Sequence, residues 1–185
     1  MMFYNTLSQA KQNLLDDNIG VIPTDTIYGI VGRAFSSTAT EEVFRIKKRP
    51  VENPLITLIA DWSDLATHYG VTPTPEQQAF SELHWPGPVS LGFPYQPLLP
   101  EYIHRGSGVF FVRLPDNEAL RNLLRSTGPL FATSANITGN KPAQSAEEAY
   151  AVFGNTLDFY VTGITLDGNP SIMYDLSQKP YTQLR

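Results

Sequence analysis

Three cationic side chains stand together at Lys47, Lys48 and Arg49, immediately before Pro50. We place them in the last turn of a helix, because a proline disfavours helical geometry in the residue before it. Cations suit the negative end of a helix dipole, and a solvated helix end is therefore one interpretation. An arginine fork also fits phosphate and carboxylate oxygens. The run by itself predicts either a helix end or an anion site.

A second polar group follows a short apolar stretch, at Thr24, Asp25 and Thr26. It puts two hydroxyls and a carboxylate at the exit of a strand, where open α/β sheets usually hold polar ligands. The same residue types are also typical of an Asx or Ser/Thr turn. For this segment alone, the turn is the more common explanation.

A third polar group ends an apolar stretch at residues 132–136, and Thr138 and Gly139 follow it. Ser134 and Asn136 are two positions apart, so in an extended chain they would project to the same side. A plain polar turn is the alternative here.

Considered together, the three groups predict a ligand site. A lysine and an arginine at a helix end, a Ser/Asn pair and a threonine-rich turn could bind a triphosphate and a small amino acid without any nucleophile. The histidines His68, His84 and His104 are too scattered in the sequence to suggest a zinc site, and we predict no metal ligands.

Hydrophobic periodicity predicts alternating helices and strands that would position these groups. The predicted helices span residues 6–17, 38–49, 65–69, 75–83, 117–125 and 145–153. The predicted strands span residues 21–22, 28–31, 54–60, 89–93, 109–114, 130–133 and 159–161, with further segments near Ile172 and Gln183.

Local signals support several of these boundaries. Thr38 with Glu41, and Ser145 with Glu148, have the spacing of capping boxes, and Gly20 could stop the first helix. We find no internal repeat or linker. The fold class is therefore α/β, with a large, twisted, mostly mixed β-sheet flanked by helices, in one domain over residues 1–185.

The composition limits the function classes. The chain has 185 residues, of which 42% are hydrophobic, and this is enough to bury one core without a disulfide. A net charge of −5 argues against a broad basic surface for nucleic acid. The absence of cysteine excludes thiolate catalysis, and the start of the chain lacks a long apolar run. We expect a cytoplasmic protein that binds no membrane.

Six segments, in order, resemble the motifs of YrdC/TsaC proteins over residues 21–185. Residues 24–29 resemble P-T-[ED]-T-x-Y-G, residues 47–55 resemble K-x-R-P…N-P-L, residues 85–88 are W-P-G-P, and residues 134–136 resemble S-x-N. Residues 112–115 and 171–175 fit the same order. The resemblance implies a YrdC-like fold and the short, single-domain bacterial form of a threonylcarbamoyl-AMP synthase.

The resemblance also implies a reaction and its partners. The family makes threonylcarbamoyl-AMP from L-threonine, bicarbonate and ATP, and releases pyrophosphate. A separate transferase complex then delivers the group to an adenosine of tRNA, and weak binding of tRNA is compatible with this. We expect Mg²⁺ to accompany ATP, because Mg²⁺ is commonly held by substrate phosphates and water.

Residue roles follow from the resemblance. Lys47 and Arg49 are the expected catalytic clamp on phosphate and carboxylate oxygens. The nucleotide would also meet Asn53, Asn136 and Arg185, although Arg185, as the last residue of the sequence, could instead fray. Threonine would meet Thr26, Arg113, Ser134 and Ser171. We expect Trp85 to pack in the core.

Two positions depart from the family pattern. The chain has Ile172 where relatives with an extra domain have threonine, and Leu58 where they have histidine. Two other functions remain open. One is a non-catalytic RNA-binding module of the same fold, associated with tRNA or the ribosome. The other is carbamoyl adenylylation in hydrogenase maturation, an activity that normally belongs to much longer chains.

Overall fold

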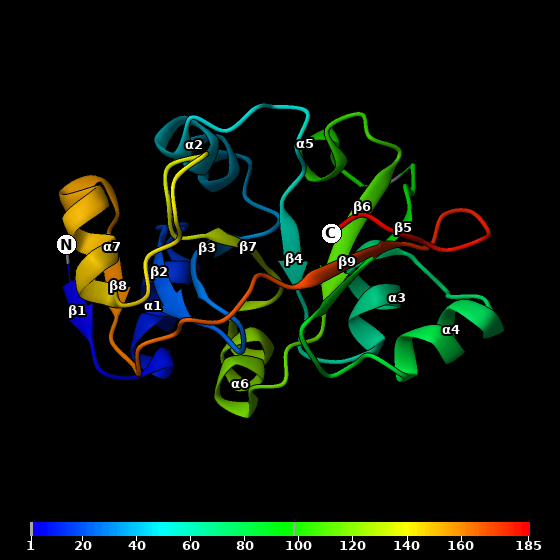
Figure 1. Ribbon diagram of the computed structural model, residues 1–185, viewed down its shortest axis with the longest axis horizontal. Coiled ribbons are helices and arrows are strands. Elements are labelled where there is room, and N and C mark those ends of the chain that lie inside the picture. The colour runs from blue at the N-terminus through cyan, green and yellow to red at the C-terminus, as the bar shows by residue number, and fades with distance from the viewer. Residues whose placement is uncertain (1, 98) are drawn as a thin grey trace.

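The computed structural model describes residues 2–97 and 99–185. Ten strands form one sheet, in the order β1-β8-β2-β3-β7-β4-β6-β5-β9-β10 (Figure 1). The strands are β1 (Met2–Tyr4), β2 (Gly20–Pro23), β3 (Tyr28–Arg33), β4 (Ile56–Leu58), β5 (Val89–Pro94), β6 (Val109–Arg113), β7 (Leu130–Ser134), β8 (Phe159–Val161), β9 (Ile172–Asp175) and β10 (Thr182–Gln183). Four neighbouring pairs are parallel and five are antiparallel, which confirms the mixed sheet.

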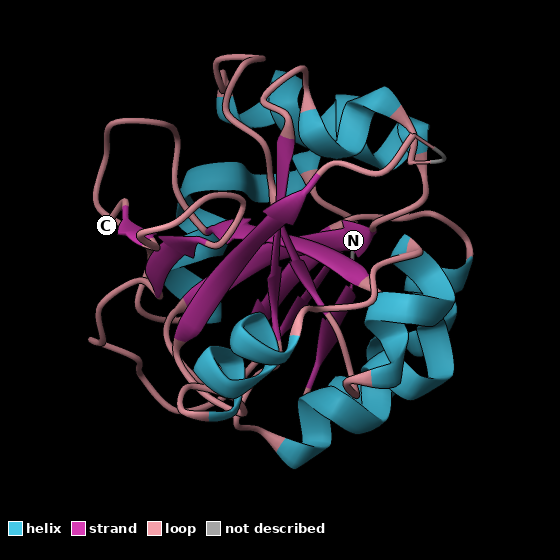
Figure 2. Ribbon diagram, turned by 90° about the vertical axis from the view of Figure 1, so that its right-hand side faces the viewer, coloured by secondary structure: helices cyan, strands magenta, loops and turns pink. Residues whose placement is uncertain are grey.

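Helices cover the sheet from outside, and the strands cross one another in a strong twist (Figure 2). The α-helices are α1 (Lys11–Leu15), α2 (Ser37–Lys47), α3 (Ser63–Tyr69), α4 (Pro75–Glu82), α5 (Glu101–His104), α6 (Glu118–Thr127) and α7 (Ala146–Phe153). Two 3₁₀ helices, Leu7–Ala10 and Gly154–Thr156, precede α1 and follow α7. Helix α7 lies near the β1 end of the sheet, whereas α3 and α4 lie near the β9 end (Figure 1).

Strand alternation divides the interior into clusters of buried side chains. Val21, Ile30 and Phe131 pack with α2 and α7. Their neighbours Ile22 and Val31 point to the opposite face and pack with α1 and α6. A third cluster joins α3 and α5 to β5 and β6 in the other half of the sheet. The two halves meet where β7 pairs with β4, which is where the polar ends of several strands converge.

The structure corrects two predicted helix boundaries. The capping box of Thr38 is wrong, because α2 begins earlier and the N-cap is Ser36, whose Oγ accepts the N–H of Ala39 at 3.2 Å. The first helix is also wrong in form and length, because it is a 3₁₀ turn followed by five α-helical residues. Gly20 does not stop this helix; it begins β2.

Other predictions agree more closely with the structure. Ser145 caps α7 by accepting the N–H of Glu148 at 3.1 Å, and Asn117, where the sequence predicts the start of a helix, is the N-cap of α6. The buried strand predicted at 54–60 is shorter, with only Ile56–Leu58 paired, and the helix predicted at 65–69 begins two residues earlier. Strand β1 and helix α5 were not predicted. Trp85 is a core residue, as expected, and its Nε1 donates to the carbonyl of Val89 at 2.7 Å.

Candidate functional site

An open cavity of about 670 Å³, measured with the space at its mouth, lies where the two halves of the sheet meet. Six of the residues predicted from the sequence line it: Thr26, Arg49, Arg113, Ser134, Ser171 and Arg185. Three others, Lys47, Asn53 and Asn136, do not line it. The strands contribute apolar walls, including Ile56, Ala132 and Met173. The predicted groups therefore converge on one site, although not every member faces it.

Lys47 lies behind the cavity wall, with a side chain that is only 1% exposed. Its Nζ donates to the main-chain carbonyls of Ser134 and Asn136, and to Oδ1 of Asn136 at 3.0 Å. Burial, together with the positive charge of Arg49, lowers the pKa of Lys47 to about 7. In this structure the lysine therefore supports the turn after β7. From the sequence, Lys47 was instead expected to contact the phosphate directly.

The Ser134–Asn136 pair is organised by that lysine. Oγ of Ser134 donates to Oδ1 of Asn136 at 2.6 Å, and Nδ2 of Asn136 donates to the carbonyl of Asn140. The main-chain N–H of Thr138 donates to the carbonyl of Lys47 at 3.1 Å. Asn136 is thus a buried support residue, while Ser134 reaches the cavity.

Arg49 faces the cavity from the segment that follows α2, and neutral oxygens orient it. Its Nε donates to the carbonyl of Asn53 and its Nη2 to the carbonyl of Pro54, each at 2.9 Å. Burial lowers its pKa, and the charge of Arg185 lowers it further. Asn53 contributes its carbonyl to this arrangement, whereas the residue itself is exposed and lies outside the cavity lining.

Arg113, at the end of β6, is buried beside a carboxylate. Its Nη1 donates to Oδ1 of Asp25 at 2.7 Å and to Oγ1 of Thr26 at 3.2 Å. The two side chains of this ion pair are 5% and 6% exposed. Burial lowers the pKa of Arg113, the charge and hydrogen bond of Asp25 oppose this effect, and the charge of Arg185 lowers the pKa further. The other oxygen of Asp25 accepts the N–H of Asp116 at 3.1 Å.

The threonine-rich turn combines both interpretations of its sequence. Oγ1 of Thr24 accepts the N–H of Thr26 at 3.1 Å and donates to the carbonyl of Ile27 at 2.7 Å, so Thr24 forms a Ser/Thr turn. Thr26 contacts Arg113 and lines the cavity. The segment is therefore a turn whose two threonines also line the cavity.

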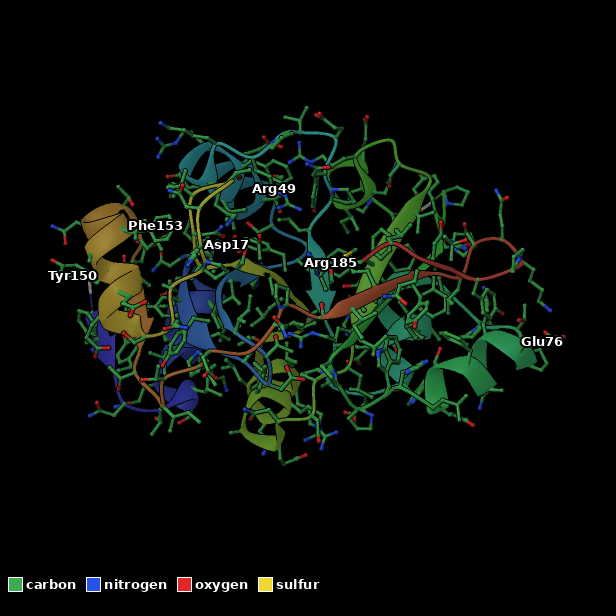
Figure 3. The ribbon with its side chains drawn as sticks, viewed as in Figure 1. Asp17, Arg49, Glu76, Tyr150, Phe153 and Arg185 are labelled. Atoms are coloured by element: carbon green, nitrogen blue, oxygen red, sulfur yellow. The ribbon has the colours of Figure 1, made fainter. Side chains whose placement is uncertain are left out.

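Arg185 is held in place at the cavity by strand β9. Its Nε donates to the carbonyl of Ser171, and its own carbonyl accepts the N–H of Met173, each at 3.1 Å. Arg49 and Arg185 both lie in the central region of the molecule, whereas Tyr150 and Phe153 on α7 and Glu76 on α4 mark its two ends (Figure 3). These contacts place the side chain of Arg185 in the cavity lining.

Ser171 is buried, and its Oγ lies 2.9 Å from Oγ of Ser90, so either hydroxyl can donate. The preceding loop approaches the threonine-rich turn closely, because a Cβ added to Gly168 would lie 2.6 Å from the carbonyl of Thr26. This close contact brings Pro170 and Ser171 to the cavity.

Three residues deserve comparison with the sequence predictions. Leu58, which replaces the family histidine, is buried in the core with 0% exposure and lies outside the cavity lining. Asp25 was part of a predicted polar group but had no individual role, and Ser90 was not predicted, although each contacts a predicted site residue. The signal for Ser90 is a single hydroxyl between Val89 and Leu91 in an apolar strand.

The lining combines positive charge with hydroxyl groups. Within the described residues it contains three arginines and no acidic side chain, and Lys47 lies directly behind it. Such a surface suits phosphate and carboxylate oxygens. No cluster of three or more His, Cys, Asp or Glu side chains suited to a metal ion occurs in residues 2–97 and 99–185. In the same ranges, no helix has the length and apolar character needed to span a bilayer.

Comparison with known proteins gives consistent matches. The Sua5/YciO/YrdC family model, described as telomere recombination, matches residues 12–185. A threonylcarbamoyl-AMP synthase of Idiomarina loihiensis is 32% identical over 153 residues, which cover 82% of each chain. One from Enterobacter sp. is 33% identical over 176 residues, covering 92% of this chain and 90% of the relative.

A solved structure agrees with these sequence matches. P. abyssi Sua5, crystallised in complex with L-threonine, matches with a TM-score of 0.91 at 28% identity. The match covers 100% of this chain but 57% of Sua5, so the present chain spans just over half of that protein's length. The fold is thus shared with a protein whose structure contains an amino acid.

Proposed function

Because the chain belongs to the Sua5/YciO/YrdC family, we propose that it synthesises L-threonylcarbamoyl-AMP from L-threonine, bicarbonate and ATP, with release of pyrophosphate. It is then an L-threonylcarbamoyladenylate synthase, a nucleotidyltransferase. One observation carries the proposal: three arginines from three separate segments face a single cavity that has no acidic lining residue among those described. Relatives that match this chain over most of their length have the same activity in their names.

The reaction consists of two bond-forming steps. The amine of threonine adds to the carbon of bicarbonate, and water leaves, which gives a carbamate. An oxygen of the carbamate then attacks the α-phosphorus of ATP, and the bond from that phosphorus to the pyrophosphate oxygen breaks. Neither step requires a covalent bond to the protein. The protein must align two anions and neutralise the charge that develops on the phosphate.

The residues of the cavity can be assigned to these tasks. We propose that Arg49 and Arg185 bind the phosphates, because within the described residues neither forms an ion pair with a carboxylate, whereas Arg113 does. Arg113 and Thr26 would bind the carboxylate and hydroxyl of threonine, with Ser134 and Ser171 nearby. Lys47 would act from behind, by holding the turn that carries Ser134.

Mg²⁺ would enter with ATP. The cavity offers the hydroxyl oxygens of Thr26 and Ser134 but no carboxylate among the described lining residues, a donor set that fits an ion carried mainly by phosphate oxygens and water. When bound, Mg²⁺ would neutralise phosphate charge. Asn53 and Asn136 fit this scheme as residues that place Arg49 and Ser134, through a carbonyl and an amide, respectively.

We further propose that the product passes in the cytoplasm to a tRNA threonylcarbamoyl transferase complex, which would form N6-threonylcarbamoyladenosine. A mixed anhydride of this kind is a reactive acyl donor, so a transferase is the class of enzyme that would consume it. Any contact with tRNA would be local and weak, because the chain has a net charge of −5.

The decisive assay supplies purified protein with ATP, Mg²⁺, radiolabelled bicarbonate and one amino acid at a time. Pyrophosphate release and label incorporation with threonine, but not with alanine, are the expected result. No pyrophosphate with any amino acid would contradict the proposal. If RNA then bound at the same cavity, the non-catalytic alternative would be favoured.

A further inference from the structure

The charges around the cavity are not balanced in the same way on its two sides. Among the described residues, Asp25 is the one acidic residue that forms an ion pair with an arginine of the lining. Its Oδ1 accepts from Nη1 of Arg113 at 2.7 Å, and its Oδ2 accepts from the main-chain N–H of Asp116 at 3.1 Å. Both carboxylate oxygens are therefore engaged by the protein, and Asp25 does not line the cavity.

We propose that Asp25 is a positioning residue that orients Arg113 and balances its charge, so that Arg113 binds the single carboxylate of the amino acid and does not bind phosphate. This inference rests on the proposed function. It extends that function to a residue that contacts no substrate.

The orientation follows from the hydrogen bonds on one edge of the guanidinium. Asp25 and Thr26 both contact the same nitrogen, Nη1, and the two side chains of the ion pair are almost fully buried. Nε of Arg113 is buried and has no hydrogen-bond partner among the described residues. Asp25 therefore makes the shorter of the two hydrogen bonds to Nη1, and the one that is strengthened by charge on both partners.

The charge balance leads to selectivity between anions. Arg113 with Asp25 is a neutral pair, and its remaining donors can bind one carboxylate. Arg49 and Arg185 keep their full charge, because neutral carbonyls orient them. A polyphosphate is favoured on that side, since attraction between charges grows with the charge of each partner. Without Asp25, Arg113 would compete for phosphate.

The test compares Asp25→Asn with a matched control. Asp17→Asn removes a carboxylate from another Asp–Arg pair, that with Nε of Arg33 at 2.9 Å, which is half exposed. Asp17 has a φ of 62°, a conformation that asparagine also adopts readily. The control thus removes the same charge without new backbone strain, and it should keep wild-type kinetics.

For Asp25→Asn we expect the KM for L-threonine to rise about 10-fold or more, with the KM for ATP unchanged. Inorganic pyrophosphate should also become a stronger competitive inhibitor against threonine. A purely structural role would leave the pattern of pyrophosphate inhibition unchanged. An unchanged threonine KM, or equal increases in both KM values, would overturn the proposal.

Asp25→Glu serves if the asparagine variant does not fold. It keeps the charge but adds a methylene in a buried position, so the threonine KM should rise several-fold while the ATP KM stays constant. A folded Asp25→Glu enzyme with the wild-type threonine KM would overturn the proposal. Wild-type protein that turns over no amino acid would overturn the proposed function first, and the role of Asp25 with it. Normal wild-type turnover with unaffected variants would overturn only the role of Asp25.

Discussion

Arg49 and Arg113 face the same cavity from different halves of the sheet, but neutral carbonyl oxygens hold the first and a carboxylate holds the second. Arg185 lies near enough to both arginines to lower their pKa values, and Lys47 lies behind the wall on the Arg49 side. On the Arg113 side, Asp25 cancels the charge. One cavity can therefore present a strongly positive wall to a polyanion and a more nearly neutral one to a zwitterion.

Removal of the Asp25 carboxylate, on the Arg113 side of the cavity, should have the largest effect on stability. Asp25→Asn leaves a buried arginine without its counter-ion, and such changes cost about 3–5 kcal/mol of the free energy of unfolding. The exposed pair of Asp17 with Arg33 predicts a loss of less than about 1 kcal/mol for Asp17→Asn. Urea denaturation of both variants measures the difference. Equal losses would show that burial does not distinguish the two pairs.

Removal of Arg49 should lower the catalytic rate and leave the fold intact. Arg49→Ala is expected to lower kcat/KM by about 10² to 10³, because it removes a charged donor from developing phosphate charge. Its melting temperature should stay within a few degrees of the wild type. Arg45→Ala is the matched control, since Arg45 is an exposed arginine of the neighbouring helix that pairs with Glu42. Loss of folding in Arg49→Ala would mean that the residue is mainly structural.

Lys47, which is buried behind the wall on the Arg49 side, should make the free energy of unfolding depend on pH. In the folded protein the pKa of Lys47 is lowered to about 7 by burial and by Arg49, whereas an unfolded lysine has a pKa of about 10.4. Between these values the unfolded chain binds the extra proton. The free energy of unfolding should therefore rise with pH from about 7 towards 10, and this contribution is lost as pH falls through 7.

Lys47→Met should flatten that slope, which for one proton is at most about 1.4 kcal/mol per pH unit. Lys11→Met, an exposed lysine on α1, provides the control and should keep it. Chemical denaturation at intervals between about pH 7 and 9.5 measures the effect below the range in which tyrosines titrate. A slope that is identical in wild type and Lys47→Met would contradict the lowered pKa.

Much of the fold could be predicted from the sequence, because the signals are local. The cap at Ser145 and the apolar strands depend on residues a few positions apart. Predicted helix boundaries were wrong where two nearby residues could each act as the N-cap, as with Ser36 and Thr38 at the start of α2. Strand β1 has three residues at a sheet edge, too few for a clear alternation.

The candidate site was predictable in membership but less so in role. Residue types and motif order identified six side chains that do line the cavity. Their partners could not be predicted, because the contacts join positions far apart in the chain: Arg113 meets Asp25 across 88 residues, and Lys47 meets Asn136 across 89. Which of two cations faces a ligand and which lies behind the wall is decided by such long-range packing.

A crossed measurement of KM tests whether the two sides of the cavity bind different substrates. Arg49→Ala should raise the KM for ATP and leave that for threonine nearly unchanged, whereas Arg113→Lys should do the reverse, because lysine keeps the charge but lacks the planar fork. Pyrophosphate release at varied concentrations of each substrate gives all four values. Parallel increases of both KM values in both variants would show that the two sides do not bind different substrates.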